Sequence, residues 1–282
     1  MAISILVDSC CDVTPALKNL LELRVIPLEV RIGNTYSHLD DETLDPQDFL
    51  AKMKASREAT STACPSPEDY AAEMRATDAC IVVTLSSKLS GSYNAAMMGR
   101  ELVLEESPDK QVYVLDSQSA SAGQTRLALF LADKIREELP FDDIVRETCA
   151  LRDKMRTMFV LEDLSNLIKA GRISKAAGVI GSMLSLRPLM SENGEGEIIC
   201  LEKIRGTANA LKRLVQKVAE MTSDAAHRSV RLVISQCNCA ERAQTLKKDL
   251  LSACPALEDV LVVPTCGVST VYANDGGIVI AF

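Results

Sequence analysis

The fold is decided by the stretch Cys80-Ile-Val-Val-Thr-Leu85, which is followed at once by Ser86-Ser-Lys-Leu-Ser-Gly-Ser-Tyr93. The first part is a continuous apolar run, typical of a strand that is buried on both faces of a parallel sheet. The second part is rich in small hydroxyl residues and leads into a helical pattern that begins near Ser92. A buried strand, a short polar turn and a helix together form the repeating unit of parallel α/β folds.

The same unit recurs on both sides of this stretch. Residues 3–7 form a short apolar run that stops at Asp8 and Ser9, and residues 111–115 form another that stops at Asp116 and Ser117. A helical pattern follows each run. We therefore expect an α/β fold whose N-terminal domain has a mostly parallel sheet with helices on both faces. In such sheets ligands bind beyond the carboxyl ends of the strands, and this is where the polar turns would lie.

The connections in this first half are predicted less sharply. Residues 24–32 are expected to form one strand, in which Pro27 indicates an edge or a bulge. Residues 33–45 are expected to be a polar loop. Residues 60–67 are expected to be a loop that runs into the start of a helix.

The second half of the chain has a different pattern. Glu192-Asn-Gly-Glu-Gly196 is a clear hairpin turn between two apolar segments. A hairpin combined with strand–helix–strand crossovers predicts a second α/β domain with a mixed sheet. We place the domains at residues 1–155 and 156–282, with the ligand site between them. The expected elements are helices over residues 141–156, 162–170, 174–184, 207–221 and 240–251, and strands over residues 186–191, 197–203, 230–235, 260–263 and 277–282.

Composition excludes several classes of function. The chain of 282 residues is 47% hydrophobic and carries a net charge of −8, which disfavours nucleic acid as a partner. It has only two histidines, His38 and His227, and no tryptophan. No apolar run is long enough to span a bilayer, so we expect a cytoplasmic protein with at most transient membrane contact. The ten cysteines are scattered rather than spaced as metal ligands, and we expect no metal and no cofactor.

Three hydroxyl-rich segments are the candidate binding elements: residues 60–67, 86–93 and 116–123. Hydroxyl groups and free backbone N–H groups at the start of a helix together favour a bound anion. The same residues also serve as ordinary helix caps and turns, and this alternative stays open. Gly178-Val-Ile-Gly-Ser-Met-Leu-Ser185 is a predicted helix whose small residues suit close packing, either against a ligand or against the core.

An enzyme is the competing interpretation of the same residues. Ser90 at a strand-to-helix turn has the setting of a serine nucleophile, but neither histidine lies near it in the sequence to act as its base. Asp8 and Asp12 without further ligands are weak evidence for a metal. Neither glycine-rich signature for nucleotide phosphates is present.

Five motifs, in order along the chain, resemble the DegV family of bacterial fatty-acid-binding proteins. The family segments are Asp-Ser-x-x-Asp, Thr-Ser-Gln-Pro-Ser, Ser-Ser-x-Leu-Ser-Gly-Thr-Tyr, Asp-Ser-x-x-x-Ser-x-Gly and Gly-Gly-Arg-Ile-Ser. They are matched by Asp8-Ser-Cys-Cys-Asp12, Thr62-Ala-Cys-Pro-Ser66, Ser86-Ser-Lys-Leu-Ser-Gly-Ser-Tyr93, Asp116-Ser-Gln-Ser-Ala-Ser-Ala-Gly123 and Ala170-Gly-Arg-Ile-Ser174.

This resemblance implies two α/β domains with a long-chain fatty acid buried between them and no chemistry performed by the carrier itself. The fatty acid carboxylate would be held by Thr62 and Ser90, with Gly91 beside them. In many Gram-positive bacteria such proteins present the acid to a fatty acid kinase. Asp8, Ser9, Ser117 and Tyr272 would lie on the rim of the site, and Arg172 and Arg205 would contact the head group or a partner protein.

The chain departs from the family pattern at several positions. Ala63 and Cys64 replace the usual Ser and Gln, and Ala170 replaces a Gly. Where the family usually has His-x-Gly-Pro-Gly, the last strands align Tyr272-Ala-Asn-Asp-Gly276, so Tyr272 stands at the position of the histidine. A phenol can still donate a hydrogen bond, so carboxylate binding is retained, whereas presentation to a kinase is less directly implied. A serine-dependent acyl hydrolase and a binder of another small carboxylate remain the alternatives.

Overall fold

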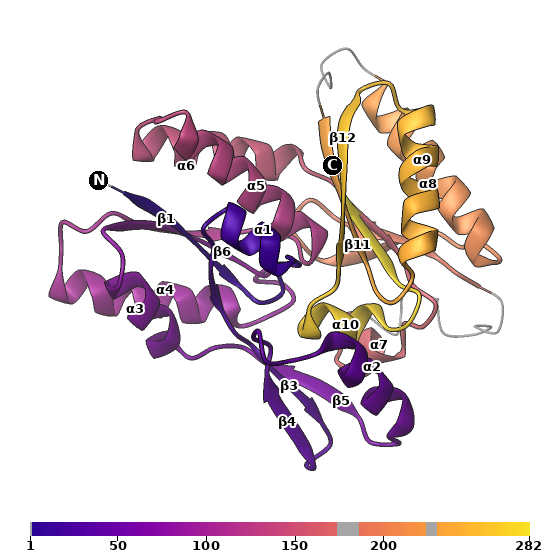
Figure 1. The fold of residues 1–282 in the computed structure, drawn as a ribbon, viewed down its shortest axis with the longest axis horizontal. Helices are drawn as coiled ribbons and strands as arrows, with labels where there is room; N and C mark the ends of the chain where they lie inside the picture. The colour runs from indigo at the N-terminus through magenta and orange to yellow at the C-terminus, as the bar shows by residue number, and fades with distance from the viewer. Residues whose placement is uncertain (1, 174–185, 224–229) are drawn as a thin grey trace.

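The computed structural model describes residues 2–173, 186–223 and 230–282. The predicted helix over residues 174–184 and the small-residue segment 178–185 lie outside these residues. The described chain forms three sheets, of four, six and three strands. Figure 1 shows the first two side by side, with the small third sheet below them and next to helix α10.

The first sheet is wholly parallel, as predicted. Its strand order is β2-β1-β6-β7, and every residue of β6 is buried. Side chains alternate along the strands, so that Leu6 packs on one face while Ile5 and Val7 pack on the other. The strands are β1 (Ile3–Asp8), β2 (Arg24–Ile26), β6 (Ala79–Thr84) and β7 (Val112–Asp116). Helices α3 (Pro67–Arg75) and α4 (Ser92–Glu106) cover one face, and α1 (Pro15–Leu20), α5 (Ala122–Arg136) and α6 (Phe141–Lys154) lie toward the other.

The second sheet is mixed, which confirms the prediction for the second half. Its order is β10-β9-β8-β13-β11-β12, with β11 and β12 parallel and the other pairs antiparallel. The strands are β8 (Thr157–Val160), β9 (Leu189–Glu192), β10 (Ile198–Glu202), β11 (Val230–Gln236), β12 (Leu257–Pro264) and β13 (Ile278–Ala281). Helices α8 (Thr207–Thr222) and α9 (Ala240–Ala253) pack on its outer face (Figure 1).

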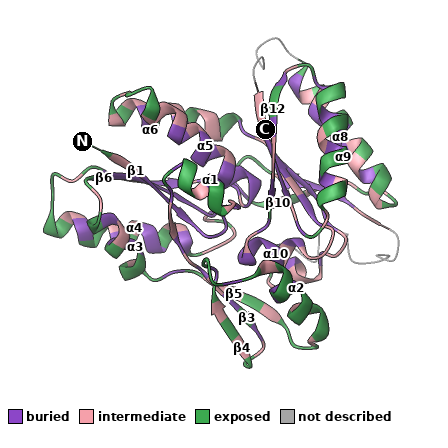
Figure 2. Cartoon of the chain, in the orientation of Figure 1, coloured by how far each residue is buried: buried purple, intermediate pink, exposed green. Residues whose placement is uncertain are grey.

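Helix α5 joins the two sheets. It packs against β1 and β6 of the first sheet and against β11 and β13 of the second. Leu127 and Leu131 of α5 share one buried cluster with Val233, Val263 and Ala281. Figure 2 shows the buried residues concentrated on the sheets and on the inward sides of the helices. A continuous apolar core therefore links the two halves, and the division of the chain at residue 155 stays a prediction.

The third sheet corrects the prediction for the first half. Residues 24–32 do not form one strand, because the chain turns at Pro27 and leaves the first sheet. The segments 33–45 and 60–67, both expected to be loops, each contain a strand. These strands are β3 (Glu29–Ile32), β4 (Tyr36–Leu39) and β5 (Thr60–Ala63), paired antiparallel in the order β4-β3-β5. Both β4 and β5 are short, polar and partly exposed, so they lack the apolar alternation that indicates a strand.

Three further elements differ from the sequence prediction. Strand β8 and helix α10 (Gly267–Ala273) were not predicted, and α7 (Ser165–Lys169) is shorter than expected. Helix α10 has small residues and no side-chain cap of its own, so local sequence gives no start signal for it. Helix α2 (Pro46–Ala55) packs beside α10.

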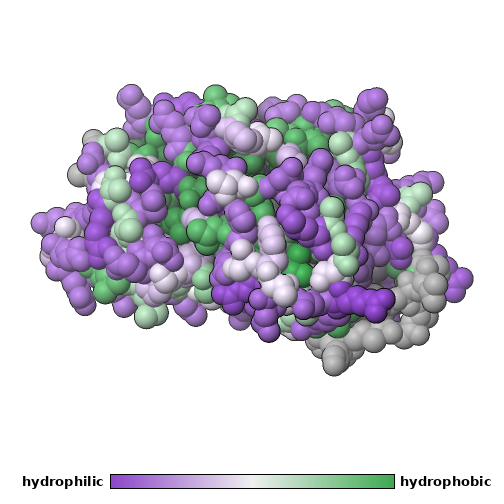
Figure 3. All heavy atoms as spheres, turned by 60° about the horizontal axis from the view of Figure 1, so that its bottom comes forward, coloured by the Kyte–Doolittle hydropathy of each residue, from purple (hydrophilic) through white to green (hydrophobic). Residues whose placement is uncertain are grey.

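Polar residues cover most of the face that Figure 3 brings forward, and apolar residues gather toward its middle. Within the described residues, no helix has the length and hydropathy needed to cross a bilayer. All ten cysteines lie in the described part of the chain and are free thiols.

The turn of the β9–β10 hairpin fastens the second half to the first. Ser86 Oγ donates a hydrogen bond to the carbonyl of Gly196 at 3.0 Å. Gly196 has φ +87°, and a Cβ added there would lie 2.3 Å from Ser86 Oγ and 2.9 Å from Gln118 Cα. The contact therefore requires a residue without a side chain.

We expect Gly196→Ala to destabilise the protein more than Gly194→Ala does. Both glycines have positive φ, so each substitution costs about 1–2 kcal/mol of backbone strain. Only Gly196 also meets backbone atoms, and overpacking of this kind adds about 1–3 kcal/mol. The free energy of unfolding from urea denaturation measures both variants. If the two variants lose equal free energies of unfolding, the contact of the hairpin turn with Ser86 and Gln118 does not hold the two halves together.

Candidate functional site

A cavity of about 240 Å³ lies where the three sheets meet. Strand β5, the loop after β6 and the loop after β7 line it from the first half. The inner face of the second sheet, α7 and α10 line it from the second half. The three hydroxyl-rich segments singled out in the sequence all contribute lining residues, through Thr62, Ser90 and Ser119 among others.

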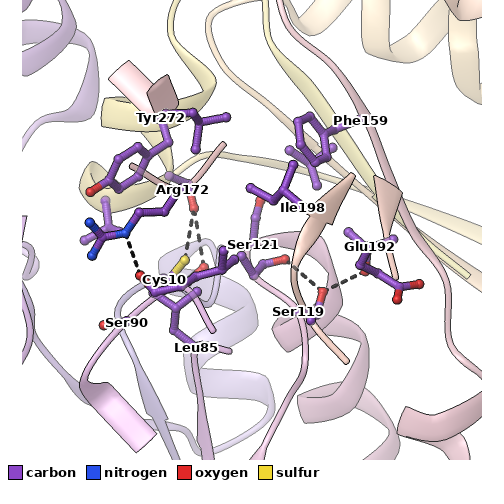
Figure 4. Close-up of a pocket in the computed structure, with 18 of the residues that line it drawn as sticks. Cys10, Leu85, Ser90, Ser119, Ser121, Phe159, Arg172, Glu192, Ile198 and Tyr272 are labelled. Atoms are coloured by element: carbon purple, nitrogen blue, oxygen red, sulfur yellow. Dashed lines mark hydrogen bonds between the residues drawn. The ribbon is translucent and has the colours of Figure 1, made fainter. Parts of the chain in front are cut away.

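One end of the cavity carries hydroxyl groups. Thr62 Oγ1 and Tyr272 Oη are 2.9 Å apart and share a hydrogen bond, although the residues are 210 positions apart in the chain. Ser90 and Gly91 line the same cavity from the start of α4, whose first turn has no side-chain cap. Of the residues predicted for the carboxylate and the rim, the structure thus gathers Thr62, Ser90, Gly91 and Tyr272 around the cavity. Figure 4 labels Ser90 and Tyr272 among them.

Arg172 crosses from the second half to the first at this end. Its Nε donates to the carbonyl of Leu89 at 2.8 Å, and its Nη1 donates to the carbonyl of Ala170 at 2.5 Å. Figure 4 shows the guanidinium group beside Tyr272 and above Ser90. The side chain of Arg205, which was predicted alongside it, is exposed and does not line the cavity.

Much of the remaining wall is apolar, and a second group of polar side chains also lines the cavity: Gln118, Ser119, Ser121, Thr157, Ser191, Glu192 and Ser269. The apolar side chains come mainly from the loop after β6, the inner face of the second sheet, α7 and α10. They are Leu85, Leu89, Phe159, Leu161, Leu167, Ile198, Val268, Ala273 and Val279. Such a lining suits an aliphatic chain, because it offers contact area with few groups that need hydrogen bonds.

Three residues predicted on the rim lie beneath it instead. Asp8, Ser9 and Ser117 are buried and are absent from the cavity wall. Asp8 accepts hydrogen bonds from the backbone N–H groups of Cys10 and Leu85 and from the Gln124 side chain. Ser9 Oγ accepts from the Leu28 N–H, and Ser117 Oγ accepts from that of Ser119. These residues hold the loops that form the wall and do not face a ligand themselves.

Two more buried carboxylates hold the start of α10, the helix that carries Tyr272. Asp12 accepts from the Cys266 N–H at 2.8 Å, and Asp40 accepts from the N–H groups of Gly267 and Val268 at 2.7 and 2.8 Å. Burial raises the pKa of Asp8, Asp12 and Asp40 to about 6 in each case, against the opposing effect of these hydrogen bonds.

The cavity has the groups to bind an anion but not the partners of a nucleophile. The hydroxyl of Ser90 contacts the backbone N–H and the hydroxyl of Ser92, and no histidine or lysine of the described residues hydrogen-bonds to it. His38 is exposed on β4, and His227 lies outside the described residues. Burial also raises the pKa of the Cys10 thiol in the wall, which keeps it protonated. Among the described residues no cluster of histidine, cysteine and carboxylate side chains is arranged to hold a metal.

Gln118 lies in a candidate segment but was not singled out, and Cys10, Phe159 and Ser269 in the wall were not named as site residues. Cys10 and Gln118 sit directly after predicted strands, so their place at the carboxyl edge was available as a signal. Phe159 and Ser269 lie in β8 and α10, the elements that the sequence did not predict, and no local pattern marks them.

A sequence model of one protein family, described as "Uncharacterised protein, DegV family", matches residues 2–282. A DegV domain-containing protein of Streptococcus pneumoniae is 31% identical over 286 residues, which is 100% of this chain and 99% of that protein.

Solved structures give the same result. A DegV family protein of Ruminococcus gnavus, refined with vaccenic acid, has 35% identity and a TM-score of 0.93, with 99% of each chain covered. The Fatty Acid Kinase B3 protein of Streptococcus pneumoniae, loaded with linoleic acid, has 30% identity and a TM-score of 0.88 over 100% of this chain and 99% of that one. A DegV family protein of Eubacterium eligens, loaded with heptadecanoic acid, has 27% identity and a TM-score of 0.88 over 99% of each chain.

The buried carboxylates make a prediction about pH. A carboxyl with a pKa of about 6 in the folded chain and about 3.9 in the unfolded chain binds more protons when folded. Its contribution to stability is therefore fully present below pH 4 and is lost as the pH rises through 6. We expect the free energy of unfolding to increase by about 1.3 kcal/mol per group as the pH falls from 7 to 5, and by roughly 3 kcal/mol in all once the pH is below 4.

In the Asp40→Asn variant the free energy of unfolding should change less steeply with pH than in the unsubstituted protein, whatever the absolute stability of the variant. Asp41→Asn is the matched control, because hydrogen bonds from Thr43 lower the pKa of the exposed Asp41 and its contribution has the opposite sign. Denaturant unfolding at several pH values measures both slopes. An unchanged slope in Asp40→Asn would contradict the assignment of this titration.

Proposed function

The chain belongs to the DegV family, and from this premise we propose that it binds a long-chain fatty acid in the cavity, with the carboxylate at Thr62 and Ser90. The observation that carries the proposal is a largely apolar cavity in which Thr62, Tyr272 and Ser90 supply hydroxyl groups at one end. That three family members of known structure carry fatty acids supports it. The protein then acts as a carrier and not as an enzyme.

Counting protons shows how the polar end can hold a carboxylate. A hydroxyl has one proton to donate, and a carboxylate only accepts. Thr62 and Tyr272 use one proton between them, so their pair has one proton left for the ligand. Ser90 can supply a second donor. The uncapped first turn of α4 beside Gly91 adds backbone N–H groups and the positive end of the helix dipole.

The hydrocarbon chain supplies most of the binding free energy. Burial of each methylene is worth roughly 0.8 kcal/mol, so about 15 of them contribute on the order of 12 kcal/mol before the costs of association. Two or three hydrogen bonds to the head group add less than this. The polar end therefore sets the orientation of the acid, and the contacts of its hydrocarbon chain with the apolar wall provide most of the affinity.

The partner that we propose is a fatty acid kinase, to which the chain presents its bound acid. The basis is the similarity to the Fatty Acid Kinase B3 protein, together with Arg172 at the hydroxyl end of the cavity. The hydrolase alternative has less support, because Ser90 has Ser92 and no base as its partner. A binder of another small carboxylate would have the same polar end but no need for the apolar wall.

We expect protein purified from bacterial cells to contain a long-chain fatty acid, detected by mass spectrometry after denaturation. Stripped protein should take up oleic acid, and the double variant Thr62→Ala with Ser90→Ala should bind it roughly ten- to a hundredfold more weakly, because two hydrogen bonds to a charged group are lost. Titration calorimetry measures the affinity.

Ser61→Ala with Ser87→Ala is the matched control, since both serines neighbour the site without lining the cavity. Its affinity should equal that of the unsubstituted protein. Absence of any lipid and of uptake by stripped protein would contradict the function. A short polar carboxylate in place of a lipid would favour the alternative binder, and turnover of acyl esters that disappears in Ser90→Ala would favour the hydrolase.

Tyr272 provides a test of the kinase partnership. Tyr272→His restores the family's usual side chain next to Thr62. In the unsubstituted protein the Tyr272 hydroxyl lies 2.9 Å from Thr62 Oγ1. An imidazole can carry positive charge near neutral pH, whereas the phenol donates one neutral hydrogen bond. We expect the variant to bind oleic acid with similar affinity. A fatty acid kinase with ATP should convert the bound acid to acyl phosphate faster than it does on the unsubstituted protein. Equal rates of acyl phosphate formation would mean that the residue at this position does not govern presentation.

A further inference from the structure

The hydroxyl of Ser90 is paired with a second, buried hydroxyl that lies away from the cavity. Ser92, the first residue of α4, has its Oγ 2.9 Å from Ser90 Oγ, and its backbone N–H also donates to Ser90 Oγ at 3.2 Å. Ser92 is completely buried and does not line the cavity. Its side chain therefore acts on a ligand only through Ser90.

A bound carboxylate fixes the direction of this hydrogen bond. Ser90 must give its single proton to the carboxylate, because the carboxylate has none to donate. The contact between Ser90 and Ser92 must then run from Ser92 to Ser90. In that arrangement Ser90 Oγ accepts two hydrogen bonds from Ser92, one from its N–H and one from its hydroxyl, and its own proton points to the ligand.

We propose that Ser92 is a positioning residue that sets Ser90 as a donor and so selects ligands whose head group only accepts hydrogen bonds. The inference rests on the proposed function and deepens it, because it names the feature by which a fatty acid is preferred over a neutral lipid of equal length. The order of donation is Ser92 to Ser90 and Ser90 to the carboxylate.

The test compares oleic acid with oleyl alcohol, which has the same chain and a head group that both donates and accepts. Ser92→Ala should weaken binding of the acid on the order of tenfold and change binding of the alcohol by less than about twofold. Ser92→Cys, which keeps the size of the side chain but donates only weakly, should weaken binding of the acid by about threefold with the same sparing of the alcohol. Ser92→Thr keeps the hydroxyl and should restore the preference for the acid.

Three results would overturn the inference. Binding of the acid that is unchanged in both Ser92→Ala and Ser92→Cys would show that Ser92 does not act on Ser90. Equal weakening of acid and alcohol would show a general disturbance of the cavity. Where Ser92→Ala fails to fold, an unchanged ratio of acid to alcohol affinity in Ser92→Cys is sufficient to reject it. If the unsubstituted protein binds no fatty acid, the proposed function fails as well, so the two failures are distinguishable.

Discussion

Two buried carboxylates from the first half of the chain, Asp12 and Asp40, hold the start of helix α10, and the cavity depends on this attachment. Together they accept hydrogen bonds from three successive N–H groups, those of Cys266, Gly267 and Val268. An unpaired buried carboxylate costs several kcal/mol, so the start of a helix, with its free N–H groups and partial positive charge, is a favourable partner. Because Tyr272 lies on the same helix, the attachment also sets the distance between its hydroxyl and Thr62.

The two halves are joined unevenly around the cavity. On the side of α5 they share a buried apolar cluster, in which Leu127 packs with Val233 and Ala281. At the cavity the contacts are single hydrogen bonds, such as Ser119 Oγ with Thr157 Oγ1 and Arg172 Nε with the Leu89 carbonyl. A hydrogen bond of this kind contributes about 1 kcal/mol, much less than a cluster of buried aliphatic side chains. Separating the halves therefore costs less free energy at the cavity than at α5.

Local patterns in the sequence were enough to predict the parallel first sheet and the mixed character of the second, but not strand β8 or the parts that close the cavity. The apolar run before Ser86 indicated a buried parallel strand, and the polar turns after three strands indicated the edge at which the cavity lies. Strand β5 could not be predicted in the same way, because Thr60–Ala63 is polar and is a strand only through its pairing with β3. Helix α10 starts at Gly267 because Asp40, more than 200 residues earlier, caps it. Contacts at such separation have no trace in local composition.

The same limit applies to the candidate site residues. Resemblance to the family brought together Thr62, Ser90 and Tyr272, and the structure gathers all three around one cavity. The roles of Asp8 and Ser117 were less accessible, because a polar residue after a strand can face either the ligand or the backbone of the next loop. Burial decides between these, and it depends on which loops pack above the residue. Both residues are buried beneath the wall that they support.

The neutral donors at the polar end fit the carrier function that we propose. A buried ion pair between the carboxylate and a lysine would add to affinity that the hydrocarbon chain already supplies, and breaking it on release would leave a buried unpaired charge at a cost of about 3–5 kcal/mol. Hydroxyl groups can instead rotate and hydrogen-bond to one another when the carboxylate leaves, as Thr62 and Tyr272 do at 2.9 Å. The Arg172 guanidinium is held by backbone carbonyl groups and is exposed, so its charge is solvated in either state. The polar end can therefore orient the acid without trapping it.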